Sequence, residues 1–376
     1  MKFIIRRENL KKGLSIVGHI TTKNINLPIL NNVLIRANSG GVELVSTNLE
    51  IGIIHRLRGK VENDGEFTVD SKTISEYVNF LAGDNVEINE VNEELKIECD
   101  NYKTKIKGES AKEFPLIPTL SGENYCICEI EDIKRALSQV IFSVSNNENR
   151  IELSGVLFSF FGSRLVLAST DSYRLAEKEI GINWQGEAIE NQKFIVPAKT
   201  IQEFLRIISN FSDSDSSEEN INQVKIFISD NQIMFSVDST DLVSRLINGN
   251  FPDYRQIVPE KFNTSVILNR NEFSRAIKAA AIFSKSGIND VGLDFKGGKL
   301  VVYSSSGQSG ESRIELSCEQ NGSDNEIIVN FRYLLDGLNN INDDQINLKV
   351  ISDNSPCMLS PTKEENYFYI VMPIRQ

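Results

Sequence analysis

The sequence predicts an α+β protein built from three repeats, each with two helices and an antiparallel sheet. Three observations lead to this fold class: a strand-to-helix pattern occurs three times, an earlier helix recurs in each unit, and hairpins carry glycine at their tips. The chain has 376 residues, 40% of them hydrophobic, so it is long enough for roughly two to four domains with cores of their own.

The earlier helix of each unit is marked by an apolar residue that recurs four positions later, with basic residues between the two. The three apolar pairs are Leu10 and Leu14, Ile133 and Leu137, and Phe273 and Ile277. An acidic residue near the start of each stretch suits the positive end of a helix. These residues are Glu8, Glu131 and Glu272, and we expect helices over 6–18, 131–141 and 270–285.

Runs of β-branched and apolar residues predict antiparallel hairpins after each of these helices. The expected strand pairs are 33–36 with 42–45, 157–161 with 165–169, and 293–295 with 299–303; a further pair is 224–228 with 232–237. The tips of the first three hairpins carry Gly40 and Gly41, Gly162, and Gly297 and Gly298. Glycine at these positions is typical of tight turns.

A short strand leads directly into a second helix in each unit. The copies cover 67–74, 194–201 and 327–334, and their valines at 69, 196 and 329 are offset by 127 and 133 positions. Asp70, Pro197 and Asn330 are residue types that favour a helix start. We expect helices over 71–82, 197–208 and 330–341, and domains over 1–120, 126–256 and 262–376.

Positive charge is concentrated in the six expected helices, although the chain carries a net charge of −12. These helices hold 14 basic and 7 acidic residues, so the rest of the chain carries −19. If the helices share one surface, that surface attracts the phosphates of nucleic acid without regard to base sequence. The alternative is that they are ordinary solvated helix faces with short-range ion pairs.

Size estimates favour a dimer for any chain of three repeats that surrounds DNA. A repeat of about 125 residues measures roughly 30–35 Å across. Three such bodies in a closed triangle leave a gap of about a few ångströms, whereas six in a hexagon leave roughly 30 Å. Only the second opening admits a duplex that is about 20 Å wide.

Catalytic interpretations find little support in the residues. There are two histidines, His19 and His55, and the glycine pair at 297–298 lies in a hairpin rather than in a phosphate-binding loop. Thr170-Asp171 and Asp253-Tyr254 lack a histidine base in a recognisable setting. We therefore expect a protein that is not an enzyme, has no catalytic residues and binds no cofactor.

The five cysteines are odd in number and irregular in spacing. Cys126 and Cys128 are open to two interpretations: half of a metal site without a partner pair, or buried reduced thiols at alternating strand positions. We expect the second and no metal. The apolar runs, such as 155–161, are too short to span a bilayer, and the first residues lack the pattern of a secretory signal. We expect a cytoplasmic protein.

Seven short stretches occur in order along the whole chain: LPIL (27–30), TNLE (47–50), EFP (113–115), STDSYRLA (169–176), IVP (195–197), GNFPDY (249–254) and YIVMPIR (369–375). Together they make the chain similar to the β sliding clamps of bacterial DNA polymerase III. The resemblance implies a head-to-tail homodimer of three-domain clamp subunits, a ring with helices lining a hole for duplex DNA. It implies a processivity factor at the nucleoid that tethers the replicative polymerase.

The resemblance also implies a hydrophobic pocket between the second and third domains. This pocket receives a short linear motif shared by the polymerase catalytic subunit, the clamp loader and repair proteins. The positions that match it are Arg150, Leu153, Thr170, Tyr173, Arg174, Leu175, Pro252, Ile257, Asn330, Tyr333, Met372, Pro373 and Ile374. A few buried apolar anchors carry most of the binding energy of such motifs.

The resemblance and the basic helices together give candidate DNA contacts at Lys11, Lys12, Lys23, Lys72, Lys134, Arg135, Lys199, Arg206, Arg275 and Lys278. For the dimer interface, the matching positions are Ile106 on a first-domain edge strand and Ile282 and Phe283 on a third-domain helix. Plain core packing is the alternative for Ile282 and Phe283. The competing function is a scaffold that gathers partner peptides without DNA.

The sequence departs from the family pattern at several of these positions. Ser172-Tyr173 stands where many members have Gly-His, and Ile151 and Glu152 differ on the DNA side. Gln256 stands where arginine is common, and Gln376 replaces a final leucine. These departures concern pocket affinity and DNA contacts rather than the fold.

Overall fold

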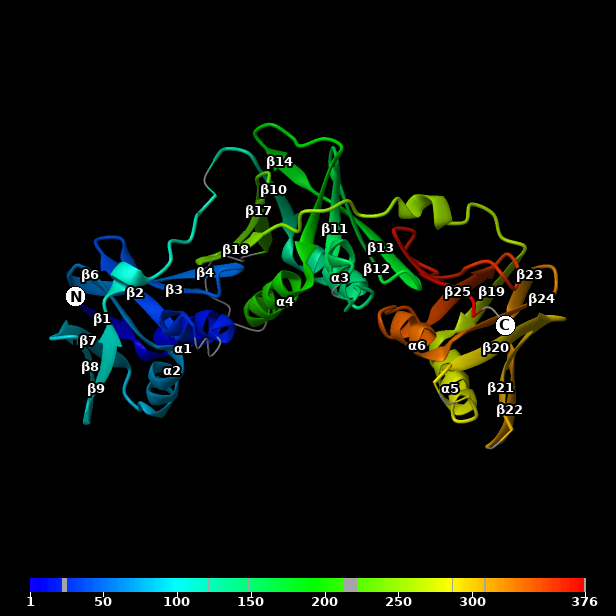
Figure 1. Ribbon diagram of the computed structural model, residues 1–376, viewed down its shortest axis with the longest axis horizontal. Helices are drawn as coiled ribbons and strands as arrows, with labels where there is room; N and C mark the ends of the chain where they lie inside the picture. Colours follow the sequence, from blue (N-terminus) through cyan, green and yellow to red (C-terminus); the bar gives the residue numbers. More distant parts are fainter. Residues whose placement is uncertain are drawn as a thin grey trace. The chain divides into compact units, whose positions relative to one another are not determined.

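The computed structural model describes residues 1–21, 26–120, 122–147, 149–212, 222–285, 287–307 and 309–374 (Figure 1). By its internal contacts the chain forms two compact units. The first unit comprises Met1–Ile130, Asn183–Ala188 and Arg206–Leu246, and the second comprises the remaining segments. Both units draw on the predicted second domain, and the domain boundaries at 1–120, 126–256 and 262–376 stay a prediction.

The first unit is built on one antiparallel sheet. In order across the sheet, its 14 strands are β14 (Asn183–Gln185), β10 (Tyr125–Glu129), β16 (Gln223–Ile228), β17 (Gln232–Val237), β18 (Thr240–Arg245), β4 (Ile51–Leu57), β3 (Gly41–Thr47), β2 (Asn32–Asn38), β6 (Gly65–Asp70), β9 (Tyr102–Glu109), β8 (Glu94–Cys99), β7 (Asn85–Val91), β1 (Lys2–Arg6) and β5 (Gly59–Asn63). β18 pairs with β4, with Thr240 opposite His55. A segment of the predicted second domain thus continues the sheet of the first.

Helices α1 (Arg7–Val17) and α2 (Ser71–Phe80) lie side by side in the first unit (Figure 1). α1 packs against β3 and β4 and buries Leu10, Leu14 and Val17. Lys11 and Lys12 remain exposed on its other side. Three short 3-10 turns complete the unit: η1 (Gly18–Ile20), η2 (Pro28–Asn31) and η3 (Ala111–Glu113).

The second unit contains two antiparallel sheets. The larger has nine strands in the order β15 (Gln192–Pro197), β11 (Gly155–Phe161), β12 (Arg164–Thr170), β13 (Arg174–Gly181), β27 (Tyr367–Val371), β26 (Cys357–Pro361), β25 (Gln345–Val350), β19 (Thr264–Asn269) and β23 (Glu319–Gly322). The smaller has four: β22 (Gly310–Ser317), β21 (Lys299–Ser306), β20 (Asp290–Lys296) and β24 (Asn325–Asn330). β13 pairs with β27, which brings residues near 174 to the last strand.

The other helices are α3 (Ile130–Ile141), α4 (Ala198–Ser212), α5 (Arg270–Ala281) and α6 (Phe331–Asn339), with 3-10 turns η4 (Ile151–Leu153) and η5 (Tyr254–Ile257). All six predicted helices are therefore confirmed. Asp70 accepts a hydrogen bond from the backbone N–H of Thr73 (2.8 Å), and Asn330 from that of Arg332 (2.9 Å), so both cap their helices as expected.

Most of the predicted helix ends differ from the structure by one or two residues, and the predicted ends of α4 at 208 and of α5 at 285 were each wrong by four residues, since α4 continues to Ser212. α4 begins one residue after Pro197, which is the last residue of β15. α5 ends at Ala281 rather than at 285, so Ile282 and Phe283 lie just beyond the helix. The physical reason is a tighter turn: the N–H groups of Phe283 and Ser284 bond to carbonyls three residues back, at 3.0 and 3.2 Å.

The four predicted hairpins are also confirmed, and the first three have glycine in left-handed conformations at their tips. The φ angles are +127° at Gly41, +56° at Gly162, +60° at Gly297 and +77° at Gly298. A residue with a Cβ rarely adopts such angles. These glycines fix where each hairpin turns, and with it the pairing register of the strands.

Two loops at corresponding positions of the first and second repeats have the same geometry. In each, a threonine hydroxyl donates to the carbonyl four residues later, over 2.9 Å from Thr47 and 2.6 Å from Thr170. The same hydroxyl oxygen accepts from the N–H two residues later, over 3.0 Å from Leu49 and 3.1 Å from Ser172. Leu49 and Ser172 both adopt positive φ, +74° and +80°. This local match supports the internal repeat.

His55 links pH to the stability of the first unit. Burial lowers its pKa from the ordinary 6.5 to about 4, and its Nδ1 lies 2.8 Å from the Thr240 hydroxyl. Between these pH values only the unfolded chain takes up the proton, so the contribution of neutral His55 is complete above pH 6.5 and is lost as the pH falls towards 4. Chemical denaturation at pH 6.5 and 4.5 should show a loss smaller by about 2 kcal/mol in His55→Gln than in the wild type. Equal losses would contradict this role.

The cysteines lie mainly in the interior. Cys126 and Cys128 are buried at alternating positions of β10, as the second interpretation predicted, and Cys318 is half-exposed. Burial raises the pKa of the Cys126 thiol to about 12. Over the described ranges, no three His, Cys, Asp or Glu side chains gather in a way that would hold a metal ion. None of the described helices is both long and apolar enough to cross a membrane.

Candidate functional site

Two adjoining hollows in the second unit form the candidate site. The first, here called the apolar hollow, measures about 490 Å³ and is lined by Ser172, Tyr173, Ile288, Asn330, Tyr333, Met372, Pro373 and Ile374. The second, the polar hollow, measures about 400 Å³ and is lined by Ser145, Asn146, Asn147, Arg150, Asp171, Ser172, Tyr173 and Tyr333. Because they share Ser172, Tyr173 and Tyr333, the two hollows form one groove.

Backbone hydrogen bonds hold residues 372–374 in this groove. The N–H of Met372 donates to the Tyr173 carbonyl (2.9 Å), and the N–H of Ile374 donates to the Ile328 carbonyl (2.8 Å). The segment after β27 is thus fixed between the 170–174 loop and β24. Residues distant in sequence meet here because β13 pairs with β27.

Arg174 braces the wall beside Tyr333. Its Nε donates to Asp171 (2.9 Å) and its Nη1 to Asp336 (2.5 Å), while the guanidinium carbon lies 4.7 Å from the centre of the Tyr333 ring. The Tyr369 hydroxyl donates to the Tyr333 carbonyl over 3.0 Å. The guanidinium therefore joins β13 to α6 and sets the position of the Tyr333 ring.

The thirteen sequence-predicted pocket residues divide into three groups. Six line the apolar hollow: Tyr173, Asn330, Tyr333, Met372, Pro373 and Ile374. Arg150 lines the polar hollow. The others line neither hollow: Leu153, Thr170 and Leu175 are buried, Arg174 and Pro252 are partly exposed, and Ile257 is exposed.

Leu175 belongs to a buried cluster instead of an open surface. Its side chain is 1% exposed and packs with Ala168, Tyr254 and Ile370. The Tyr254 hydroxyl donates to Glu177, and burial raises the pKa of that carboxyl. A contact between Leu175 and a partner peptide stays a prediction, and it would require the cluster to open.

Sequence reasoning missed several groove residues. Ile288, which is 47% exposed, lines the apolar hollow, and Ser145, Asn146 and Asn147 line the polar one. No local pattern marks these positions, since their importance comes only from the strand pairing that brings them to the groove.

The basic helix residues differ in how far they reach solvent. Lys11, Lys12, Lys72, Arg135, Lys199, Arg275 and Lys278 are exposed, whereas Lys134 and Arg206 are partly buried. Lys23 lies outside the described residues. Arg135 forms ion pairs with Asp132 (3.0 Å) and Glu364 (3.2 Å), which offset its charge. Phosphate contacts stay a prediction for every one of these residues.

Arg206 has a contact that the sequence did not indicate. Its guanidinium donates to the carbonyls of Ser15 (3.3 Å) and Ile16 (2.6 Å), in the last turn of α1. A cation at this end of a helix is favourable, because the last carbonyls lack partners within the helix. Binding to a phosphate would compete with this capping role.

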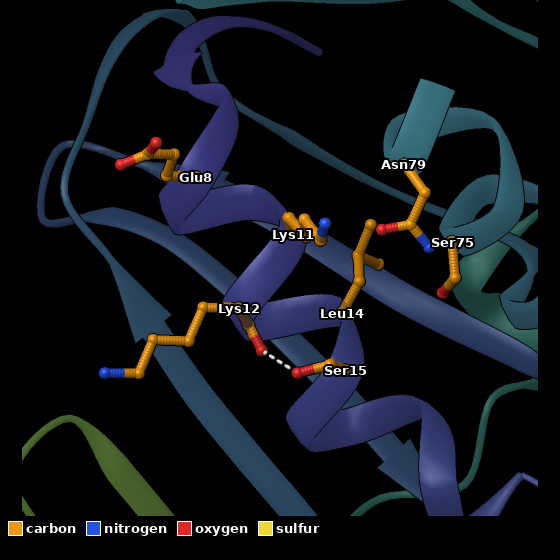
Figure 2. Close-up of a pocket in the computed structure, with 7 residues that line it drawn as sticks. All are labelled: Glu8, Lys11, Lys12, Leu14, Ser15, Ser75 and Asn79. Atoms are coloured by element: carbon orange, nitrogen blue, oxygen red, sulfur yellow. Dashed lines mark hydrogen bonds between the residues drawn. The ribbon is translucent and has the colours of Figure 1, made fainter. Parts of the chain in front are cut away.

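A shallow hollow of about 280 Å³ lies between α1 and α2 (Figure 2). It is lined by Glu8, Lys11, Lys12, Leu14, Ser15, Ser75 and Asn79. Figure 2 shows Ser75 and Asn79 of α2 facing Leu14 of α1, while the Lys12 side chain extends away from them. Lys11 and Lys12 thus leave α1 in different directions, giving the helix a broad basic surface.

The candidate dimer residues have contrasting environments. Ile106 is 8% exposed, so its side chain belongs to the core, and the described pairs leave β9 paired only with β8 along 102–107. Ile282 is 72% exposed, which rules out core packing in this chain, and Phe283 is partly buried near Gly310. Phe80, at 75% exposure, is a further exposed apolar residue that the sequence analysis did not single out.

The fold and groove define a three-repeat α+β binding protein with basic side chains on its exposed helix faces. The chain belongs to the DNA polymerase III beta subunit family: the models of its N-terminal, central and C-terminal domains match residues 1–118, 128–253 and 255–375. This confirms the resemblance found in the sequence and the predicted fold class. The family is a non-catalytic processivity subunit, so the prediction that the chain is not an enzyme is also confirmed.

Individual relatives cover the whole chain. The beta sliding clamp of Staphylococcus epidermidis is 26% identical over 100% of this chain and 99% of its own, and that of Pseudomonas putida is 26% identical over 100% of both. The structure of the DNA polymerase III beta subunit of Pseudomonas aeruginosa has a TM-score of 0.92 at 25% identity, over 100% of both chains. A sliding clamp from the same organism, bound to griselimycin, has a TM-score of 0.90 at 25% identity.

Proposed function

We propose that this chain is the subunit of a dimeric ring that encircles duplex DNA and acts as the processivity factor of the replicative polymerase. It binds short peptide segments of the polymerase, the clamp loader and repair proteins in the groove of the second unit. It acts in the cytoplasm, at the nucleoid. Sequence-independent attraction between basic helices and phosphates fits a protein that slides rather than stops.

The groove is the observation that carries this proposal. Seven of the thirteen positions matched to the family's pocket line two adjoining hollows, although they come from four separate stretches of sequence. Met372 and Ile374 offer flexible and branched apolar surface, which suits a pocket that accepts several related motifs. Asn330 and Tyr333 add polar groups that orient a bound peptide.

Two unpaired strand edges support the dimer. β22 is an outer strand of the four-stranded sheet, and β9 has a one-sided stretch over 102–107. Exposed edges of this kind present backbone N–H and C=O groups that need partners. Pairing of β9 in one subunit with β22 in the next gives the backbone N–H and C=O groups of both edges hydrogen-bond partners. It also closes the ring head to tail.

Peptide binding tests the proposal. Met372→Ala removes a partly exposed side chain from the wall of the apolar hollow and should weaken binding of a labelled Gln-Leu-Ser-Leu-Phe peptide by about tenfold or more. Fluorescence anisotropy measures this directly. Ile151→Ala is the matched control, because Ile151 is 60% exposed and lines neither hollow, and its affinity should be unchanged. A folded wild-type protein that does not bind the peptide would overturn the proposed groove.

A further inference from the structure

We propose that the polar hollow is a carboxylate subsite of the groove, with Arg150 as its cation. The subsite favours partner peptides that carry an acidic side chain beside their apolar anchors. This inference rests on the proposed function, because it concerns the same groove. It adds the chemistry of the hollow that the apolar anchors do not fill.

Arg150 is the positive group that the polar hollow presents to solvent. The other charged residue of its lining, Asp171, is 15% exposed, and its two oxygens accept from Arg174 Nε (2.9 Å) and from the N–H groups of Tyr173 (2.9 Å) and Arg174 (3.0 Å). The remaining lining residues are uncharged. Arg150 is 44% exposed, so an incoming group has access to it.

The contacts of Arg150 hold it in place without using all of its donors. Its Nε forms an ion pair with Glu152 (3.1 Å), which offsets part of its charge, and its Nη1 donates to the Ser172 hydroxyl (2.7 Å). A guanidinium has five N–H donors, so a carboxylate can add to this arrangement or replace the neutral Ser172. The exchange is favourable because hydrogen bonds between two charged groups are stronger than those to a hydroxyl.

The first repeat shows that the loop does not need the Arg150–Ser172 hydrogen bond. Leu27 precedes η2 with φ −134° and ψ 79°, just as Arg150 precedes η4 with φ −126° and ψ 67°. Leu49 occupies the positive-φ position that Ser172 occupies in the second repeat. The backbone is alike, but Leu27 and Leu49 are apolar and 46% and 47% exposed.

Arg150 and Ser172 serve ligand binding rather than folding of the loop. Since two leucines are compatible with the same loop geometry, the arginine and the serine are not required for folding of the loop. They occur in the repeat whose loop lines the groove. A charged side chain held in the wall of the polar hollow is what a site for an acidic ligand needs.

Two labelled peptides test the subsite. Both contain Gln-Leu-Ser-Leu-Phe, extended at each end by two residues that are Glu in one peptide and Gln in the other. We expect the acidic peptide to bind the wild-type protein about fivefold more tightly, the size of effect for a partly exposed ion pair. The chain's net charge of −12 works against an acidic ligand, so such a preference has to come from a local cation.

Three variants complete the test. Arg150→Gln should abolish the preference while leaving binding of the Gln peptide within about twofold. Ser172→Ala, which removes the competing hydroxyl, should retain or increase it. Arg164→Gln is the matched control, because Arg164 is 59% exposed in the same unit and lines neither hollow.

The outcomes distinguish this inference from the function on which it rests. Equal affinity for the two peptides in the wild type, or a preference that survives Arg150→Gln, would overturn the carboxylate subsite and leave the peptide groove standing. Failure of both peptides to bind would instead overturn the groove itself. Loss of the preference in Arg164→Gln as well would show a general charge effect and would also overturn the subsite.

Discussion

Replacing Ile282 with aspartate is expected to split the dimer into monomers that remain folded. Ile282 is 72% exposed in the single chain, so a charge there costs little in monomer stability. At a subunit interface the same change places an unpaired carboxylate against apolar surface, which costs about 2 kcal/mol or more. Because the closed dimer contains two such interfaces, the total loss of about 4 kcal/mol raises the dimer dissociation constant roughly a thousandfold. Sedimentation velocity over a concentration series measures the shift.

Leu116→Asp provides the matched control for this experiment. Leu116 is also exposed and apolar, at 86%, but it lies in the segment between η3 and β10 and belongs to neither β9 nor β22. Its aspartate variant should dimerise like the wild type. If Ile282→Asp stays dimeric at the lowest measurable concentration, the subunit interface does not include the residues just after α5. The head-to-tail arrangement proposed above is then wrong.

Replacing two lysines per subunit with glutamate is expected to shorten the lifetime of the protein on circular DNA by roughly tenfold or more. In a dimer, four attractions between lysine and phosphate become four repulsions between glutamate and phosphate. Lys72 is 76% exposed at the start of α2, and Lys199 is exposed in the first turn of α4. The double variant Lys72→Glu, Lys199→Glu should also flatten the salt dependence. If each lysine neutralises one phosphate, the slope of log K against log salt falls by about three to four.

A second double reversal separates this effect from net charge. Lys60→Glu and Lys193→Glu change the charge by the same amount on exposed residues of β5 and β15 rather than on helices. Loading each variant onto nicked circular DNA and following its retention by gel filtration gives the comparison. Equal retention of the helix variant and the wild type would favour a scaffold that gathers peptides without DNA.

Local signals made the helices predictable. Asp70 and Asn330 cap their own helices through hydrogen bonds within three residues, and the apolar spacing of α1 matches its buried face. Such features depend on neighbours along the chain, so they are visible in the sequence. The hairpin glycines belong to the same class, since positive φ is a property of single residues.

The groove was predictable only through the family resemblance. Tyr173, Tyr333 and Met372 line the same apolar hollow because β13 pairs with β27 and residues 372–374 hydrogen-bond to the 170–174 loop and β24. No local periodicity encodes that pairing. The burial of Leu175 was missed for the same reason, because a side chain on one sheet face is covered by segments far away in sequence.

Counting charges on helices predicted a basic surface but overstated the contribution of individual residues. Arg135 is neutralised by Asp132 and Glu364, and Glu364 is more than 200 positions away. Arg206 donates to the end of α1. A count of basic residues contains no information about such partners, so it sets an upper limit on the number of arginines and lysines that can attract phosphate.

The pairing of β18 with β4 affects how the protein unfolds. Backbone hydrogen bonds join residues 240–244 to residues 51–55, so the first repeat and this later segment should unfold together as one cooperative unit. A fragment that stops at residue 120 would leave the outer side of β4 without its neighbour. That bare edge would favour aggregation of the fragment. Proteolytic nicking near 118–124, in contrast, would leave the two pieces held together by the sheet.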